Sequence, residues 1–166
     1  SFRLYGIDVL ITDPALRKIA GLAHLENTGA RGLGTIFEQL FREFKFELPS
    51  SNVRQFVITK EMIDTPDKVL SRLLKNPLPF EQDFSNELVR RFELSLADRF
   101  GIPIGFEKTM ANRIIKEAHQ EQLPINDICN RYISRIEFAL RLLKNKPIKT
   151  KILIDEKIIN SSEMTI

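Results

Sequence analysis

The chain has 166 residues, of which 43% are hydrophobic and 28% are charged, a composition typical of a globular protein with one domain or two small ones. Its net charge of +3 comes from interleaved acidic and basic residues, so the pI of about 9.1 is only weak support for nucleic-acid binding. The single cysteine, Cys129, excludes an internal disulfide, and with two distant histidines it argues against a structural zinc site.

The first 65 residues predict a strand, two helices and a second strand. Alternating apolar residues at 7–11 predict the first strand, and a helix starts near Asp13. The apolar residues at helical spacing in this helix are Leu16, Ile19, Ala20 and Ala23. A second, longer helix follows and ends at Pro49. Its expected buried stripe consists of Leu33, Ile36, Phe37, Leu40, Phe41 and Phe44. A β-branched run at 53–59 predicts the last strand.

The middle of the chain predicts a connector. Pro66, Pro77 and Pro79 interrupt it, and residues 68–75 predict one short helix. An amphipathic helix then leads into the second half of the chain, with its apolar face formed by Phe84, Leu88, Phe92 and Leu96. Strands at 102–106 and 150–154, with a helix from near Glu107 and a second helix between them, complete the pattern.

The second half repeats the first. A shift of 95 residues places His24 on His119 and Gly6 on Gly101, and after one inserted residue near position 125 the shift is 96. The apolar positions coincide along nearly the whole repeat. We therefore expect an α+β fold of two tandem units, each a small sheet backed by helices, joined by a helical connector. The expected boundaries are 1–65, 66–91 and 92–166.

Arg31 stands in the first turn of the predicted second helix. A helix N-terminus favours anions, and a cation there costs roughly 0.3 to 1 kcal/mol unless a negative group meets it. Arg31 could therefore await a phosphate, which a guanidinium holds through two hydrogen bonds, or it could face an acidic neighbour or water. In the second copy the counterpart of Arg31 is Asn126 or Asp127, and Pro124 precedes it at the expected first helical position. The second copy therefore has the residue types that a helix N-terminus prefers, whereas the first copy has a cation there. This departure in the first copy favours a phosphate role for Arg31.

Residues 28–33, which read TGARGL, begin a stretch that closes with FELPS at 46–50. Together with the YGIDV strand at 5–9 and the FVI strand at 56–58, this stretch resembles the small C-terminal lid domain of Clp-type AAA+ unfoldases, especially the ClpX-like ones. The resemblance covers residues 1 to about 65. It departs from the family at Gly34, where a basic residue is more usual, and after residue 65, where the family's chain usually stops.

The resemblance implies a role for the TGARGL residues. It implies that Arg31 is the sensor-2 residue, which reads the terminal phosphates of ATP or ADP, with Gly29 and Ala30 beside it. Mg²⁺ and the machinery for hydrolysis would belong to a large domain outside this sequence. The resemblance also implies a homo-oligomeric ring, a hexamer in the family's plan, in which each lid contacts the large domains of its own and of the neighbouring subunit.

Three other motifs have simpler interpretations. Residues 152–156, ILIDE, have the form of a Walker B strand, but no phosphate-binding loop accompanies them, and the repeat places Asp155 and Glu156 at an ordinary strand end. The glycines at 29, 32 and 34 lack the spacing of a dinucleotide motif. Residues 104–106, IGF, look like a protease-docking loop of ClpX-like rings, but they align with 9–11 and predict a buried strand. The repeated pair His24 and His119 indicates a shared packing or capping role.

We therefore expect the C-terminal part of a Clp-type AAA+ ATPase, an ATP-dependent chaperone or unfoldase, that by itself does not hydrolyse ATP and has no catalytic or metal-binding residue of its own. The start at Ser1 inside an amphipathic pattern agrees with a piece of a longer protein. The sequence has no signal peptide and no membrane-spanning apolar run, so we expect a cytoplasmic location. The alternative is a protein-interaction or adaptor module built from two vestigial lids, which binds a protein partner and no nucleotide. Nucleic-acid binding by one helix face is a weaker third hypothesis.

Overall fold

The computed structural model describes residues 1–27 and 29–163, except for the side chains of Ser162 and Glu163. It divides into two units, residues 1–84 and 85–166. The α+β class is confirmed, because each unit combines several helices with a two-stranded parallel sheet. Among the described helices, none combines the length and the apolar character that crossing a membrane requires.

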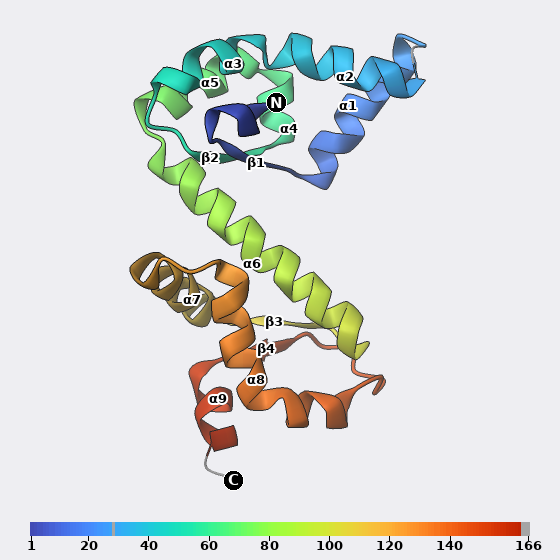
Figure 1. The fold of residues 1–166 in the computed structure, drawn as a ribbon. Coiled ribbons are helices and arrows are strands. Elements are labelled where there is room, and N and C mark those ends of the chain that lie inside the picture. Colours follow the sequence, from blue (N-terminus) through green and yellow to red (C-terminus); the bar gives the residue numbers. More distant parts are fainter. Residues whose placement is uncertain (28, 164–166) are drawn as a thin grey trace. The chain divides into compact units, whose positions relative to one another are not determined.

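The first unit begins with a 3₁₀ turn, η1 (Phe2–Tyr5), and strand β1 (Asp8–Ile11). Helix α1 (Asp13–Leu25) starts where Thr12 accepts a hydrogen bond from the Ala15 N–H. The unit continues through α2 (Gly29–Leu40), α3 (Arg42–Glu47), a 3₁₀ turn η2 (Leu48–Ser50), β2 (Gln55–Ile58), α4 (Lys60–Asp64) and α5 (Pro66–Lys75). Figure 1 shows β1 beside β2, and the two strands pair in parallel with Val9 opposite Phe56.

The predicted single helix that would end at Pro49 is wrong. The chain leaves helical geometry at Phe41, where φ is −108° and ψ is 16°, so that α2 and α3 are separate helices. Around this break, Phe41 and Phe44 pack in an aromatic cluster. Both side chains are fully buried, and their ring centroids lie 5.1 Å apart. Phe2 and Phe56 complete this cluster, with centroids 5.4 Å apart.

Three details of the first unit also differ from expectation. Leu16 is 52% exposed and Ala20 is exposed, because Ala15, Ile19 and Ala23 form the buried face of α1. Helix α5 contributes Val69, Leu70 and Leu73 to the first core, so this part of the connector packs within the first unit. The short helix α4 was not predicted, because five residues are too few to show helical periodicity.

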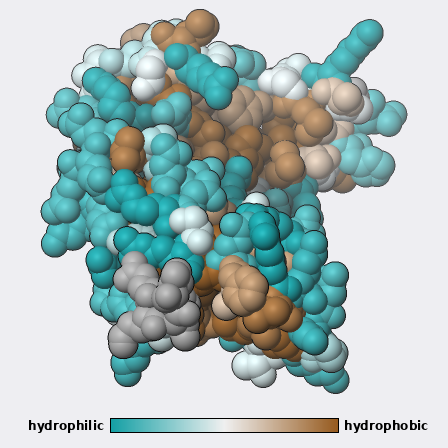
Figure 2. All heavy atoms as spheres, turned by 60° about the horizontal axis from the view of Figure 1, so that its bottom comes forward, coloured by the Kyte–Doolittle hydropathy of each residue, from teal (hydrophilic) through white to brown (hydrophobic). Residues whose placement is uncertain are grey.

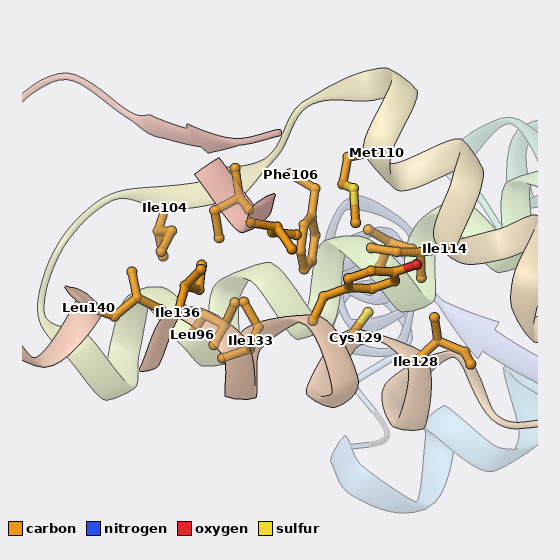
Figure 3. Close-up of a cluster of buried hydrophobic side chains, with 14 of the residues drawn as sticks. Leu96, Ile104, Phe106, Met110, Ile114, Ile128, Cys129, Ile133, Ile136 and Leu140 are labelled. Carbon is orange, nitrogen blue, oxygen red and sulfur yellow. The ribbon is translucent and has the colours of Figure 1, made fainter. Parts of the chain in front are cut away.

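Helix α6 (Leu78–Phe100) begins before the boundary between the units and ends in the second one. The second unit continues with β3 (Ile104–Phe106), α7 (Lys108–Glu121), α8 (Ile125–Leu143), β4 (Ile152–Ile154) and α9 (Glu156–Glu163). Its buried residues come from α6, both strands and all three later helices. Figure 3 shows this core, in which Ile128, Cys129, Ile133, Ile136 and Leu140 of α8 lie together with side chains of β3 and α7.

The order strand, helix, helix, strand, helix occurs in both units, apart from the break at Phe41. The strand register also agrees with the sequence repeat, because Val9 lies opposite Phe56 and Ile104 lies opposite Ile152. Residues 104–106 form the buried strand that the repeat predicted. Asn27 and Gln122, which the shift of 95 aligns, both adopt left-handed backbone conformations after the first helix of their unit, with φ of 55° and 54°.

Candidate functional site

The candidate site lies at the junction of α1 and α2. Helix α1 ends at Leu25, and α2 begins at Gly29, whose φ of 62° is the left-handed conformation that favours glycine. Thr28, the first residue of the TGARGL motif, lies outside the described residues. The structure therefore places Gly29, Ala30 and Arg31 in the first turn of a helix, as the sequence predicted.

The Arg31 side chain is exposed. Among the described residues, no carboxylate lies within ion-pair distance of its guanidinium, and the first turn of α2 carries no acidic residue. The positive end of the helix and the positive side chain are thus together, with no internal anion to offset them. The sequence left open whether Arg31 faces a phosphate, an acidic neighbour or water. Among the described residues no acidic neighbour is found, so the geometry is compatible with water or with an external anion.

A shallow hollow of about 220 Å³ lies between α1 and the start of α2, and Gly29 forms part of its wall. Its other lining residues are Ala20, Ala23, His24, Asn27 and Leu33. His24 is exposed in the last turn of α1, and its backbone carbonyl accepts a hydrogen bond from the Asn27 N–H at 3.0 Å. The structure thus brings Gly29 and His24 to one concave surface, while Ala30 and Arg31 follow Gly29 on the exposed first turn of α2.

The second unit has different chemistry at the turn that the sequence alignment pairs with this one. Helix α8 begins at Ile125, Pro124 is its N-cap, and Asp127 is an acidic residue in the first turn. An anion there agrees with the helix dipole. His119 occupies the last turn of α7, and its side chain is exposed like that of His24. Of the two shared roles expected for the histidines, packing does not agree with their exposure, whereas capping agrees with their position in the last turn of a helix.

In the motif that looks like a Walker B strand, residues 152–154 form β4 and Asp155 caps α9. The Oδ1 atom of Asp155 accepts a hydrogen bond from the Ile158 N–H at 2.9 Å. Thr59, its counterpart in the repeat, caps α4 in the same way with the Met62 N–H at 3.3 Å. Glu156 pairs with the Nη1 atom of Arg113 at 2.9 Å. Both acidic groups are thus used by the second unit itself, which agrees with the interpretation as an ordinary strand end.

A larger hollow of about 410 Å³ in the first unit was not predicted from the sequence. It lies where β2, α4, α5 and the start of α6 meet, and its apolar wall includes Val57, Val69 and Phe80. The ion pair between Arg72 and Glu61, at 2.8 Å, lines it. The two residues are eleven positions apart and belong to two different helices, so no short motif could reveal their contact. Across residues 1–27 and 29–163 there is no cluster of three His, Cys, Asp or Glu side chains suited to a metal ion.

Comparison with known proteins finds similarity over part of the chain. A stretch of 64 residues is 42% identical to the ATP-dependent Clp protease ATP-binding subunit ClpX 3 of Methylococcus capsulatus, and this covers 38% of the chain and 15% of the relative. A stretch of 64 residues is 36% identical to the mitochondrial ATP-dependent clpX-like chaperone of Saccharomyces cerevisiae, covering 39% of the chain and 12% of the relative.

A third relative is the ATP-dependent protease ATPase subunit HslU of Halalkalibacterium halodurans, 41% identical over 63 residues, or 35% of the chain and 14% of the relative. These similarities support a relationship to Clp-type AAA+ ATPases. The relationship is partial, because the chain spans 12–15% of the length of these three relatives. No family model matches the chain, and no solved structure matches it either.

Proposed function

We propose that this chain is the C-terminal portion of a Clp-type AAA+ ATPase and that residues 1–65 form its nucleotide-sensing lid. The observation that carries the proposal is Arg31, an exposed guanidinium in the first turn of α2 with no carboxylate partner among the described side chains. The similarity to ATPase subunits over about 64 residues is as long as this segment and supports it.

In this proposal Arg31 contacts a terminal phosphate of ATP or ADP held by the large domain of the whole protein. A bidentate contact between guanidinium and phosphate is charge-assisted, and it adds a negative group at the helix start, where α2 has no acidic residue in its first turn. Gly29 and Ala30 leave room for the phosphate because they have little or no side chain. Loss of the γ-phosphate on hydrolysis weakens the contact and allows the lid to move as a rigid body. Mg²⁺ binds to the large domain.

The experiment compares Arg31→Ala and Arg31→Lys in the full-length protein, with Arg17→Ala as the matched control. Arg17 is an exposed arginine on the neighbouring helix α1. We expect Arg31→Ala to weaken nucleotide binding or turnover by at least about tenfold, the equivalent of one charge-assisted hydrogen bond. Arg31→Lys keeps the positive charge but loses the two parallel hydrogen bonds of a guanidinium, so we expect it to retain only part of the activity. ATPase rates and nucleotide affinities equal to wild type would disprove the assignment.

A second candidate applies to residues 92–166, the degenerate second lid-like unit. Its α8 carries Asp127 where the first copy has Arg31, and it exposes Phe138 by 77% and Leu142 by 62% on the same helix. Figure 2 shows apolar side chains that reach the surface between hydrophilic ones. These observations favour a docking role for a protein substrate or adaptor. Replacing Phe138 and Leu142 by Ser in the full-length protein should leave basal ATPase unchanged and reduce processing of protein substrates.

The proposal includes assembly. The relatives are named as subunits of ATP-dependent proteases and as a chaperone, and by analogy the full-length protein forms a homo-oligomeric ring in the cytoplasm, with each lid against large AAA+ domains of its own and the next subunit. Size-exclusion chromatography with light scattering, with and without ATP, tests this. A full-length protein that stays monomeric with bound ATP would contradict it.

A further inference from the structure

An apolar surface of β4 and α9 is open in the second unit, whereas its counterpart in the first unit is covered. The sequence repeat, with its shift of 96 residues, pairs Val57 of β2 with Leu153 of β4 and Met62 of α4 with Ile158 of α9. Val57 and Met62 are buried, whereas Leu153 and Ile158 are 48% and 37% exposed. The same positions of the repeat therefore have a covering element in one unit only.

Helix α5 is the covering element of the first unit. It packs against α4, and its Val69 lines the same hollow as Val57 of β2. A pair of charges marks the margin of this contact, because Arg72 of α5 pairs with Glu61 of α4 at 2.8 Å. A short amphipathic helix with a charged residue at its margin is thus the element that fits this position of the repeat.

The described residues of the second unit contain no helix in the place of α5. In the first unit α4 ends at Asp64, the chain turns, and α5 begins at Pro66. Helix α9 instead continues to Glu163, past Asn160, which is the counterpart of Asp64. Up to Glu163 the second unit therefore does not fold back over its own strand as the first unit does.

The charge beside this surface is reversed between the two units. The counterpart of Glu61 is Lys157 in the first turn of α9. Lys157 is exposed, and among the described residues no carboxylate lies within ion-pair distance of its ammonium group. Its two acidic neighbours in sequence have other partners, because Asp155 caps α9 and Glu156 pairs with Arg113. A helix that covers this surface therefore meets a cation where α5 meets a carboxylate.

A second lysine extends the positive charge along β4. The Lys151 side chain passes beside Gly105, the β3 residue that pairs with Leu153. The Glu93 carboxylate also faces Gly105, but it accepts the Phe106 N–H and lies beyond ion-pair distance of Lys151. The exposed Leu153 thus has a basic side chain on either side of it along the chain.

We propose that this surface of β4 and α9 binds an acidic amphipathic helix of a partner protein, in the way that α5 covers the first unit. The apolar face of the partner helix contacts Leu153 and Ile158, and a carboxylate at the position of Arg72 pairs with Lys157. Helix α5 of a second copy does not meet this requirement, because its Arg72 carries the same charge as Lys157. The inference does not rest on the lid role of residues 1–65.

The experiment uses two synthetic peptides with the sequence of residues 64–77 as probes of the 166-residue chain. A lactam between positions 67 and 71, which are exposed in α5, keeps both peptides helical. One peptide retains Arg72 and the other carries Arg72→Glu. We expect the Arg72→Glu peptide to bind at least about fivefold more tightly, because it replaces two like charges by an ion pair. NMR titration of the chain measures both dissociation constants, and the signals of Leu153 and Ile158 should shift.

Three variants of the chain supply the controls. Lys157→Glu should reverse the preference, so that the peptide with Arg72 binds more tightly than the Arg72→Glu peptide. Leu153→Ser should weaken the binding of both peptides at least about tenfold, because it removes the apolar contact. Leu142→Ser changes another exposed leucine, on α8, and should leave both affinities unchanged. Equal urea midpoints of these variants and wild type would show that the fold is intact.

Three results would overturn the inference. One is equal affinity of the chain for the two peptides, or no shift of the Leu153 signals. Another is equal weakening by Leu153→Ser and Leu142→Ser, which would place the peptide on a different surface. The third is a set of NOE contacts to the Leu153 methyl groups in the free protein, from a second copy or from the chain's own last residues. None of these measurements involves nucleotide, so their failure is distinguishable from failure of the lid role, which the ATPase measurements test.

Discussion

Gly6 and Gly101 adopt the same left-handed backbone conformation, with φ of 70° and 65°, although they lie 95 residues apart. Each ends a helical turn and leads into the first strand of its unit. Their surroundings differ. A Cβ atom added to Gly101 would overlap Oδ1 of the Asn145 side chain, whereas one added to Gly6 would meet no atom within 4 Å.

The two glycines therefore differ in how well they tolerate alanine. Gly6→Ala should lower the free energy of unfolding of the first unit by about 1 kcal/mol, the cost of a left-handed alanine. Gly101→Ala should lower that of the second unit by about 2 kcal/mol or more, because Asn145 must also move. Urea unfolding followed by NMR signals of each unit measures both values. Adding Asn145→Gly to Gly101→Ala removes the clash, and if it restored no stability, Asn145 would not be the cause.

The elements that the sequence predicted well depend on local patterns. The sequence predicted the start of α1 near Asp13, where the helix begins, and alternating apolar residues located β1 and β3 to within two residues. The break at Phe41 could not be predicted, because it depends on contacts of Phe41 and Phe44 with residues distant in sequence. Apolar periodicity alone favoured one continuous helix there.

The candidate site was predictable in position but not in surroundings. The motif placed Arg31 in the first turn of a helix, since glycine at 29 and the apolar spacing after it mark a helix start. Whether a carboxylate from elsewhere would pair with Arg31 depends on tertiary contacts. The exposure of the His24 and Leu16 side chains also depends on which face of α1 packs against the core. Apolar periodicity does not determine that face.

Glu93 should stabilise the edge of β3 through its hydrogen bond with the Phe106 N–H. Glu93→Ala removes the acceptor from a buried strand, so we expect the second unit to lose about 1 to 3 kcal/mol of unfolding free energy and the Phe106 amide to exchange faster. Glu93→Gln keeps an oxygen acceptor and should lose less. Equal stability of the two variants would show that this hydrogen bond does not hold the strand.

Tyr132 should couple α7 to α8 through Glu117. Its hydroxyl donates to the Glu117 carboxylate, with oxygens at 2.6 and 2.7 Å, and Arg113 Nε lies 3.0 Å from Oε1 of Glu117. We expect Tyr132→Phe to cost about 1 to 2 kcal/mol, and the combined variant with Glu117→Gln to cost less than the sum of the single changes. Tyr5→Phe is the matched control, because Tyr5 is 50% exposed. Additive costs in the double-mutant cycle would contradict the coupling.

Cys129 should make the second unit less stable at alkaline pH. The thiol is fully buried in the core of Figure 3, and this burial, with the negative charge of Glu93 as a smaller cause, raises its pKa to about 12 from 9.0. Below pH 9 both the folded and unfolded states keep the proton, so the thiol does not change stability with pH. Between pH 9 and about 12 the unfolded state releases the proton and the folded state keeps it. Stability should therefore fall by up to about 1.4 kcal/mol per pH unit in this range.

The measurement that isolates the thiol is urea unfolding of wild type and Cys129→Ala from pH 8 to pH 11. The alanine variant should be less stable at pH 8, because the substitution leaves a cavity, but its stability should decline less steeply above pH 9. Tyrosine and lysine titrations are shared by both proteins and cancel in the difference between the two curves. Parallel curves would mean that the Cys129 thiol ionises equally in both states, which is incompatible with a side chain buried at 0% exposure within the second core.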